Sequence, residues 1–293
     1  MLAVTLALLS SVFWGSADFA GGLLSRRVSV AAVVLLSQAA GGLVLALVCS
    51  ISGQPFPHYF WLALAAGVFG VLGLLLFYRG LAIGKMSLVA PVAACGAVLP
   101  VFFSLATGQV PRPLTLAGLF SAMAGVALAS MTSASGTSAG QAHPREAALS
   151  AIGAAVCFGL FLLLLGRAAN LEPRSVLWLS LCTRLASVPA LALGLLFTRT
   201  SLPWRALDPR HDLRLLPAIA LVGLGDATAN TLFALANTIG SLAVVAVLGS
   251  LYPLVTAALA RFRLGELLSP RQKVGAGLAM IGVVLVALPW SPA

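Results

Sequence analysis

Nearly the whole sequence consists of apolar runs of roughly twenty residues, separated by short gaps that hold most of the charged residues. A helix of about 20 apolar residues crosses the hydrocarbon core of a bilayer, because that core is about 30 Å thick and each residue advances about 1.5 Å. Of the 293 residues, 60% are hydrophobic and only 8% are charged. These are too few charges to cover a soluble fold of this size, so the sequence predicts an integral membrane protein.

Proline, glycine and arginine clusters divide the chain into ten predicted transmembrane helices, and the expected fold class is therefore all-α. The predicted spans are residues 2–24, 30–51, 59–81, 87–107, 114–131, 147–169, 174–198, 214–236, 240–260 and 273–290. The first run lacks a positive segment and a small-residue cleavage site, and it contains Trp14 and Asp18. We therefore expect it to be a retained span and not a signal peptide.

The positive charges fall mainly on one side of this arrangement. Thirteen of the 17 Lys and Arg residues lie in the gaps after the odd-numbered spans, and three lie in the other gaps. Gaps rich in Lys and Arg face the cytoplasm, which predicts a cell-membrane protein with both termini outside the cytoplasm. Because the formal charge of +10 is confined to these gaps, it does not indicate nucleic-acid binding.

Motifs for catalysis and metal binding are missing from the sequence. The four cysteines lie inside apolar runs without C-x-x-C or Cys/His spacing, so neither a disulfide framework nor a metal site is predicted. There is no H-E-x-x-H and no nucleotide-binding loop, and all three histidines lie in gaps. We expect no catalytic residue and no cofactor, although coupling to protons stays open.

The two halves of the chain resemble each other. Residues 108–128 align with 265–285 at a constant offset of 157, with eight identical pairs. Five predicted spans in each half mean that the second half enters the membrane from the opposite side. The predicted organisation is a first repeat (1–131), a linker (132–146) and a second repeat (147–293). Inverted repeats are typical of secondary transporters, which bind substrate near the midplane between the halves.

The five-plus-five order, Trp14-Gly15 and the run GSLYPLVTAALARFRLGELLSPRQKVGAGLAMIGVVL resemble the EamA family of the drug/metabolite transporter superfamily. The resemblance implies alternating access around a cavity lined by spans 1, 3, 4, 6, 8 and 9, and export of a small metabolite. Family members carry amino acids, drugs, sugars and other metabolites, so the substrate stays open. The chain departs from the family pattern at Gln109, where members often have the glutamate kept here only at Glu266.

Ionisable residues inside spans are functional candidates, because a charge in the bilayer centre is costly. Arg184 lies well inside the seventh span and Asp226 inside the eighth, with Asn230 one turn above Asp226 on the same face. Asp226 and Asn230 can bind an ammonium or a hydrogen-bonding head group, and a carboxylate removed from water takes up a proton more readily. The alternative is that Asp226 pairs with Arg184 and holds the halves together.

Asp18 lies one turn from Trp14 on the same face of the first span. A carboxylate beside an aromatic ring is suited to bind a cation. The alternative is structural: Asp18 pairs with Arg26 or Arg27 at the cytoplasmic end of the span.

Two further groups of residues complete the predicted site. The first contains polar or amphipathic side chains that line a cavity or tie helices together, because each needs a hydrogen-bond partner away from water. Its members are Gln38, Tyr78 and Tyr252. The second contains prolines, which kink helices and are interpreted as gating elements or as static bends. Its members are Pro91, Pro100 and Pro253.

Taken together, these features predict a secondary active transporter for a small metabolite, such as an amino acid, amine or drug-like compound. A facilitative uniporter or channel-like pore is the alternative, and an intramembrane enzyme fits less well. The expected partners are the solute and membrane lipid. Small residues at four-residue spacing in spans 5 and 10 serve helix packing or a homodimer face, so the protein is expected to be a monomer or a homodimer.

Overall fold

A computed structural model of the chain describes residues 1–83, 86–108, 113–129, 144–197, 215–264 and 270–287. Every regular element within these ranges is helical. The elements are α1 (Leu2–Leu24), α2 (Val30–Ser52), α3 (Phe60–Ile83), α4 (Met86–Ala94), the 3₁₀ turn η1 (Cys95–Ala97), α5 (Val98–Ala106), α6 (Pro113–Ala129), α7 (Pro144–Leu171), α8 (Val176–Phe197), α9 (Leu216–Ile239), α10 (Leu242–Gly249), α11 (Tyr252–Leu264) and α12 (Pro270–Ala287). Their bounds lie within a few residues of the predicted spans. Most of the predicted linker lies outside the described residues.

Six of the described helices, α1, α2, α3, α7, α8 and α9, are long and apolar enough to cross a membrane. Large apolar side chains point outward from them: Leu43 is 74% exposed, Leu47 66% and Leu221 67%. In lipid this outer surface needs no polar covering, whereas polar backbone groups must be satisfied within each helix. The prediction of a multi-pass membrane protein is therefore confirmed.

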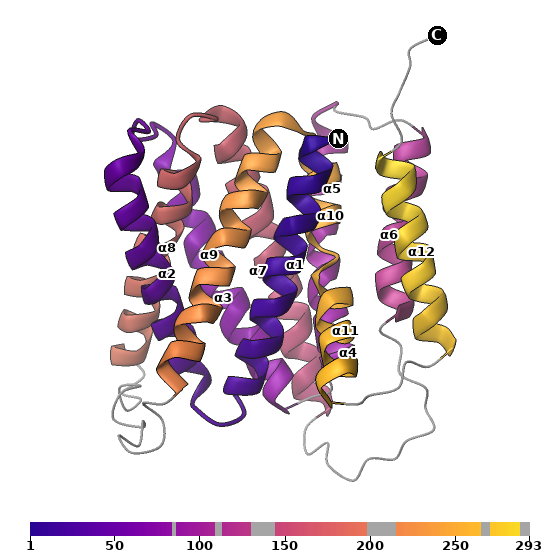
Figure 1. The fold of residues 1–293 in the computed structure, drawn as a ribbon, viewed down its shortest axis with the longest axis horizontal. Helices are drawn as coiled ribbons and strands as arrows, with labels where there is room; N and C mark the ends of the chain where they lie inside the picture. The colour runs from indigo at the N-terminus through magenta and orange to yellow at the C-terminus, as the bar shows by residue number, and fades with distance from the viewer. Residues whose placement is uncertain (84–85, 109–112, 130–143, 198–214, 265–269, 288–293) are drawn as a thin grey trace.

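The two halves of the chain are interleaved. Helices α1, α2 and α3 of the first half pack mainly on helices of the second half: α1 on α9, α2 on α8 and α9, and α3 on α7 and α8. Figure 1 shows these helices running side by side along one direction. The core of the bundle, and any site within it, is therefore built from both halves.

The small residues of the repeated segment are used for packing within the chain. Helices α6 and α12, which carry this segment, lie against each other at one side of the bundle (Figure 1). The Ser121 hydroxyl donates a hydrogen bond to the carbonyl of Leu278, its partner at the offset of 157, over 2.9 Å. A Cβ on Gly282 would lie 2.5 Å from the Gly118 carbonyl oxygen. Part of the small-residue surface that was predicted to serve helix packing or a homodimer is therefore used for packing within the chain.

The fourth and ninth predicted spans are interrupted helices. Helix α4 passes through η1 into α5, and two residues separate the end of α10 at Gly249 from the start of α11 at Tyr252. Gly96 in the first interruption and Gly249 at the second are repeat partners at an offset of 153. Each interruption is followed within four residues by a proline, Pro100 or Pro253, which has no N–H to continue the hydrogen-bond ladder. The predicted bends therefore occur at equivalent places in the two halves.

Candidate functional site

A cavity lies between the two halves of the bundle, with about 610 Å³ of space that no atom fills, part of it open to the outside. Side chains of α1, α2, α3, α7, α8, α9 and α11 surround it. Its polar lining residues are Asp18, Gln38, Thr183, Arg184, Ser187, Asp226, Asn230, Ser250 and Tyr252. Its other lining residues are Trp14, Gly67, Gly70, Val71, Leu74, Phe158, Phe161 and Leu162. An apolar wall with a few grouped polar side chains is typical of small-molecule sites.

An ion pair forms one side of this cavity. Arg184 Nη2 on α8 lies 2.8 Å from Asp226 Oδ2 on α9. Both side chains are largely shielded, with 5% and 17% of their surfaces exposed. Since both residues belong to the second half, the pair by itself joins two helices of the same half. The pairing proposed from the sequence is therefore present, but it does not hold the halves together.

Gln38 on α2 connects this ion pair to the first half of the chain. Its amide nitrogen donates to Asp226 Oδ2 over 3.1 Å, and its amide oxygen accepts from Arg184 Nη1 and, over 3.0 Å, from Ser187 Oγ. Hydrogen bonds to charged groups are stronger than neutral ones, particularly where water is excluded. Gln38 thus orients both charged side chains at once.

Glycines allow the three helices of this network to approach closely. A Cβ on Gly41 of α2 would lie 2.6 Å from the Gly223 carbonyl oxygen of α9, and a Cβ on Gly223 would overlap the backbone of Ser37. Ser37 directly precedes Gln38, and Asp226 follows Gly223 by one helical turn. The backbone contact therefore sets the distance over which Gln38 and Asp226 meet.

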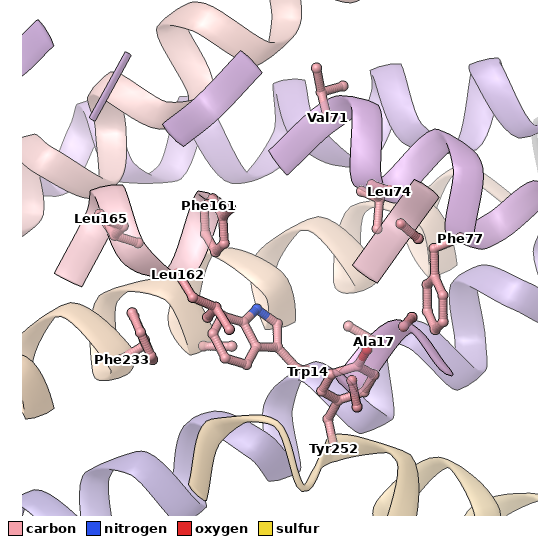
Figure 2. Close-up of a cluster of buried hydrophobic side chains, with 14 of the residues drawn as sticks. Trp14, Ala17, Val71, Leu74, Phe77, Phe161, Leu162, Leu165, Phe233 and Tyr252 are labelled. Carbon is pink, nitrogen blue, oxygen red and sulfur yellow. The ribbon is translucent and has the colours of Figure 1, made fainter. Parts of the chain in front are cut away.

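Trp14 and Asn230 form a second link between the halves. The indole N–H of Trp14 on α1 donates to the side-chain oxygen of Asn230 on α9 over 2.8 Å. The Trp14 ring lies 5.5 Å from the Phe233 ring and 6.4 Å, edge to face, from the Phe161 ring. Figure 2 shows Trp14 among Phe161, Leu162, Phe233 and Tyr252. Asp226 and Asn230, which were predicted to lie one turn apart on the same face of the helix, both line the cavity.

Asp18 lines the same cavity with 8% of its surface exposed. The alternative in which Asp18 pairs with Arg26 or Arg27 is wrong for the described residues, where neither arginine forms an ion pair with it. Arg26 and Arg27 lie in the turn that follows α1, and both are exposed there. They are eight and nine residues further along the chain, more than two helical turns, and lie beyond the end of α1.

Comparison with known proteins places this architecture in a family. A family model described as the EamA-like transporter family matches residues 1–131 and 145–288. The chain belongs to the EamA-like transporter family. The resemblance seen in the sequence is therefore confirmed, and so is its coarse functional meaning, a membrane transporter of small solutes.

Solved structures add support for the fold of this EamA-like chain. One similar crystal structure is described only as that of a protein. The match covers 97% of this chain and 96% of the chain in that structure, with a TM-score of 0.70 and 18% sequence identity. At this identity the likeness concerns the fold alone. No curated protein matches the chain.

The helices that line the cavity of this EamA-like protein differ in part from the set that the resemblance implied. Span 4, now α4 to α5, contributes none of the described lining residues, whereas α2 and α8 contribute Gln38, Thr183, Arg184 and Ser187. The physical reason is the packing of α2 on both α8 and α9, which brings these polar side chains together at the cavity. The cavity is therefore displaced toward α2 and α8.

The two predicted tyrosines of the EamA-like chain have different environments. Tyr252 lines the cavity, and its hydroxyl donates to the Ala90 carbonyl over 3.5 Å. Tyr78 is 1% exposed and lies outside the lining, where its ring packs on Phe77 and against Gly21. Since Gly21 leaves the space that the Tyr78 hydroxyl occupies, Tyr78 joins α1 to α3 and is not placed as a cavity residue.

Only two of the three predicted prolines lie next to a helix interruption. Pro100 and Pro253 follow the helix interruptions, whereas Pro91 lies within α4, which continues on both sides of it. Pro91 is therefore not the site of a break.

Some site residues were not predicted from the sequence, and some predicted features cannot be placed. Ser187 and Thr183 lie near Arg184 on α8, and the spacing of Ser187, three residues after Arg184, would have placed it on the same helical face. Phe161 had no such signal, because aromatic residues in apolar runs are common. Gln109 and Glu266 lie outside the described residues. Within the described ranges there is no group of three or more His, Cys, Asp or Glu residues that could hold a metal ion.

Proposed function

We propose that this protein is a secondary active transporter that moves a small organic solute across the cytoplasmic membrane by alternating access. The observation that carries the proposal is the Arg184–Asp226 pair, shielded inside a bundle of membrane-competent helices and facing a cavity. Charged groups at such depth are costly and are characteristic of solute and ion pathways. Gln38 and Trp14 of the first half both bond to the second half across this cavity, so relative movement of the halves would reshape it.

The topology that we propose has ten crossings. The six long helices provide six of them, the interrupted helices α4–η1–α5 and α10–α11 provide two, and α6 and α12 complete the set. Figure 1 supports it, since α1 begins and α12 ends at the same end of the bundle. Five crossings in each half give inverted repeats, and the excess of Lys and Arg after the odd-numbered spans orients both termini away from the cytoplasm. We further propose that the direction is export, with proton coupling.

The test is solute flux into proteoliposomes, measured with a panel of labelled amino acids, amines, nucleosides and sugars. We expect uptake of at least one class to saturate and to be accelerated by unlabelled solute on the far side. Gln38→Met, which removes the bonds to both charged residues at similar volume, is expected to slow this flux about tenfold or more. Ser50→Ala, on an exposed turn of the same helix, is the matched control and is expected to have no effect.

Three outcomes would decide against parts of this proposal. Flux that rises in proportion to concentration and shows no acceleration from the far side would indicate a channel-like pore. Saturable flux that an imposed pH gradient does not change would indicate a uniporter without proton coupling. A reconstituted protein that neither binds nor moves any member of the panel would contradict the transport proposal itself.

The interruption before Pro253 is predicted to be a moving part of this cycle. Pro253→Ala would supply an N–H for the Gly249 carbonyl and favour one continuous helix across the break, which we expect to slow transport about tenfold without loss of solute binding. The matched control is Pro189→Ala, because Pro189 lies inside α8 without any interruption. Initial rates and solute affinity are measured for both variants. An unchanged rate in Pro253→Ala would show that the bend is static.

A further inference from the structure

Among the described residues, Asp18 differs from the other charged residues of the cavity in having no hydrogen-bond or ion-pair partner. Its side chain is more than nine-tenths buried and lines the cavity, yet no hydrogen bond or ion pair joins its carboxylate to another described residue. A carboxylate held out of water without a partner is unstable unless a cation or a proton joins it. Asp18 is thus suited to bind a cation or a proton that enters the cavity.

The charge of the cavity lining is not balanced. The charged lining residues are Asp18, Arg184 and Asp226, and the last two neutralise each other at 2.8 Å. Gln38 and Ser187 provide further hydrogen bonds to that pair. With Asp18 ionised, the described lining therefore carries one net negative charge, located on Asp18.

The wall next to Asp18 is aromatic. Trp14 lies one turn before Asp18 on α1, and Phe161 and Tyr252 also line the space. The indole N–H of Trp14 is already bonded to Asn230, which holds the ring in place. Ammonium groups interact favourably with aromatic faces as well as with carboxylates.

We propose that the cavity accepts a small organic amine whose ammonium group pairs with Asp18 and whose apolar body lies against Trp14 and Phe161. This inference rests on the transport function proposed above and names its substrate class. A carboxylate-bearing solute would meet the negative charge of Asp18, and it would reach Arg184 only by displacing Asp226. The arrangement therefore discriminates against acids and, less strongly, against zwitterionic amino acids.

The test uses four solutes with the same phenyl body and different head groups: phenethylamine, phenylalanine, phenylacetate and 2-phenylethanol. Binding to the purified full-length protein in detergent is measured by calorimetry and by thermal shift, since a ligand of the folded state raises its apparent stability. We expect phenethylamine to bind most tightly. Asp18→Asn is expected to raise its Kd about 30-fold or more, because the buried partner charge is lost.

Two further variants separate recognition from folding. Asp18→Glu keeps the charge and is expected to retain most of the affinity for phenethylamine. Glu146→Gln removes one negative charge from an exposed position outside the cavity lining, where Glu146 pairs with Arg79, and is expected to bind the amine like wild type. Both variants also show whether binding follows the charge at residue 18 or the overall charge of the protein.

The amine site is overturned if Asp18→Asn binds phenethylamine as tightly as wild type, or if phenylacetate, phenylalanine or 2-phenylethanol binds more tightly than the amine. It is equally overturned if phenethylamine does not bind at all. The transport proposal is judged separately, by saturable flux of any solute in the wider panel. If the protein transports amino acids or sugars but does not bind the amine, the transport proposal therefore stands and the amine proposal is overturned.

Discussion

Replacing Arg184 with alanine is expected to destabilise the folded protein by about 3–5 kcal/mol, because the shielded carboxylate of Asp226 would lose its counter-charge. The two groups lie 2.8 Å apart, and water does not replace the lost partner where 5% of the Arg184 side chain is exposed. Gln38 would still donate one hydrogen bond to Asp226, which offsets only part of the loss. Unfolding in mixed micelles, followed by tryptophan fluorescence, measures the change.

The control for this prediction removes both charges. A double variant, Arg184→Met with Asp226→Leu, removes both members of the ion pair and leaves neither of them unpaired, and we expect it to recover most of the stability lost in Arg184→Ala. It is also expected to remain defective in transport, because the polar side of the cavity is gone. If the double variant were as unstable as the single one, packing of the arginine stem and not charge pairing would account for the effect.

Replacing Gly223 with alanine is expected to separate α2 from α9 and to cost about 3 kcal/mol or more, because the new Cβ would overlap the Ser37 carbonyl. The overlapping atoms belong to backbone and cannot rotate away. Since Ser37 adjoins Gln38 and Gly223 lies one turn from Asp226, the shift would also stretch the hydrogen bond between these two side chains. Yield of folded protein and unfolding in mixed micelles are the measurements.

The matched control is Gly277→Ala on α12. A Cβ there would meet no atom within 4 Å, and alanine favours a helix over glycine by about 1 kcal/mol. We therefore expect Gly277→Ala to be as stable as wild type or slightly more stable. Equal behaviour of the two variants would contradict the claim that close approach of α2 and α9 depends on Gly223.

Helix positions could be predicted closely from the sequence. The apolar run 2–24 coincides with α1, and the predicted spans 30–51 and 59–81 end within two residues of α2 and α3. The bends could also be located, because Pro100 and Pro253 lack the N–H that a continuous helix requires. Pro91 shows the limit of that rule, since it lies inside α4 without a break.

The candidate site could be predicted only in part from the sequence. The rarity of charge in apolar runs singled out Asp18, Arg184 and Asp226, and all three line one cavity. The ion-pair partners of these residues could not be predicted in the same way. Asp18 had an arginine within two turns and does not pair with it, whereas Asp226 pairs with Arg184, which is 42 residues away in the chain.

The sequence by itself determined that this is a membrane protein, where its helices lie, where two of them break, and which few residues carry charge in the apolar interior. These properties depend on local composition, which is set by bilayer thickness and by the chemistry of single residues. The tertiary structure alone decided that Gln38 joins the ion pair, that Tyr78 packs outside the cavity, and that Asp18 has no partner among the described residues. Such facts depend on how closely helices approach and how they are rotated, and contacts such as Gly223 with Ser37 set both.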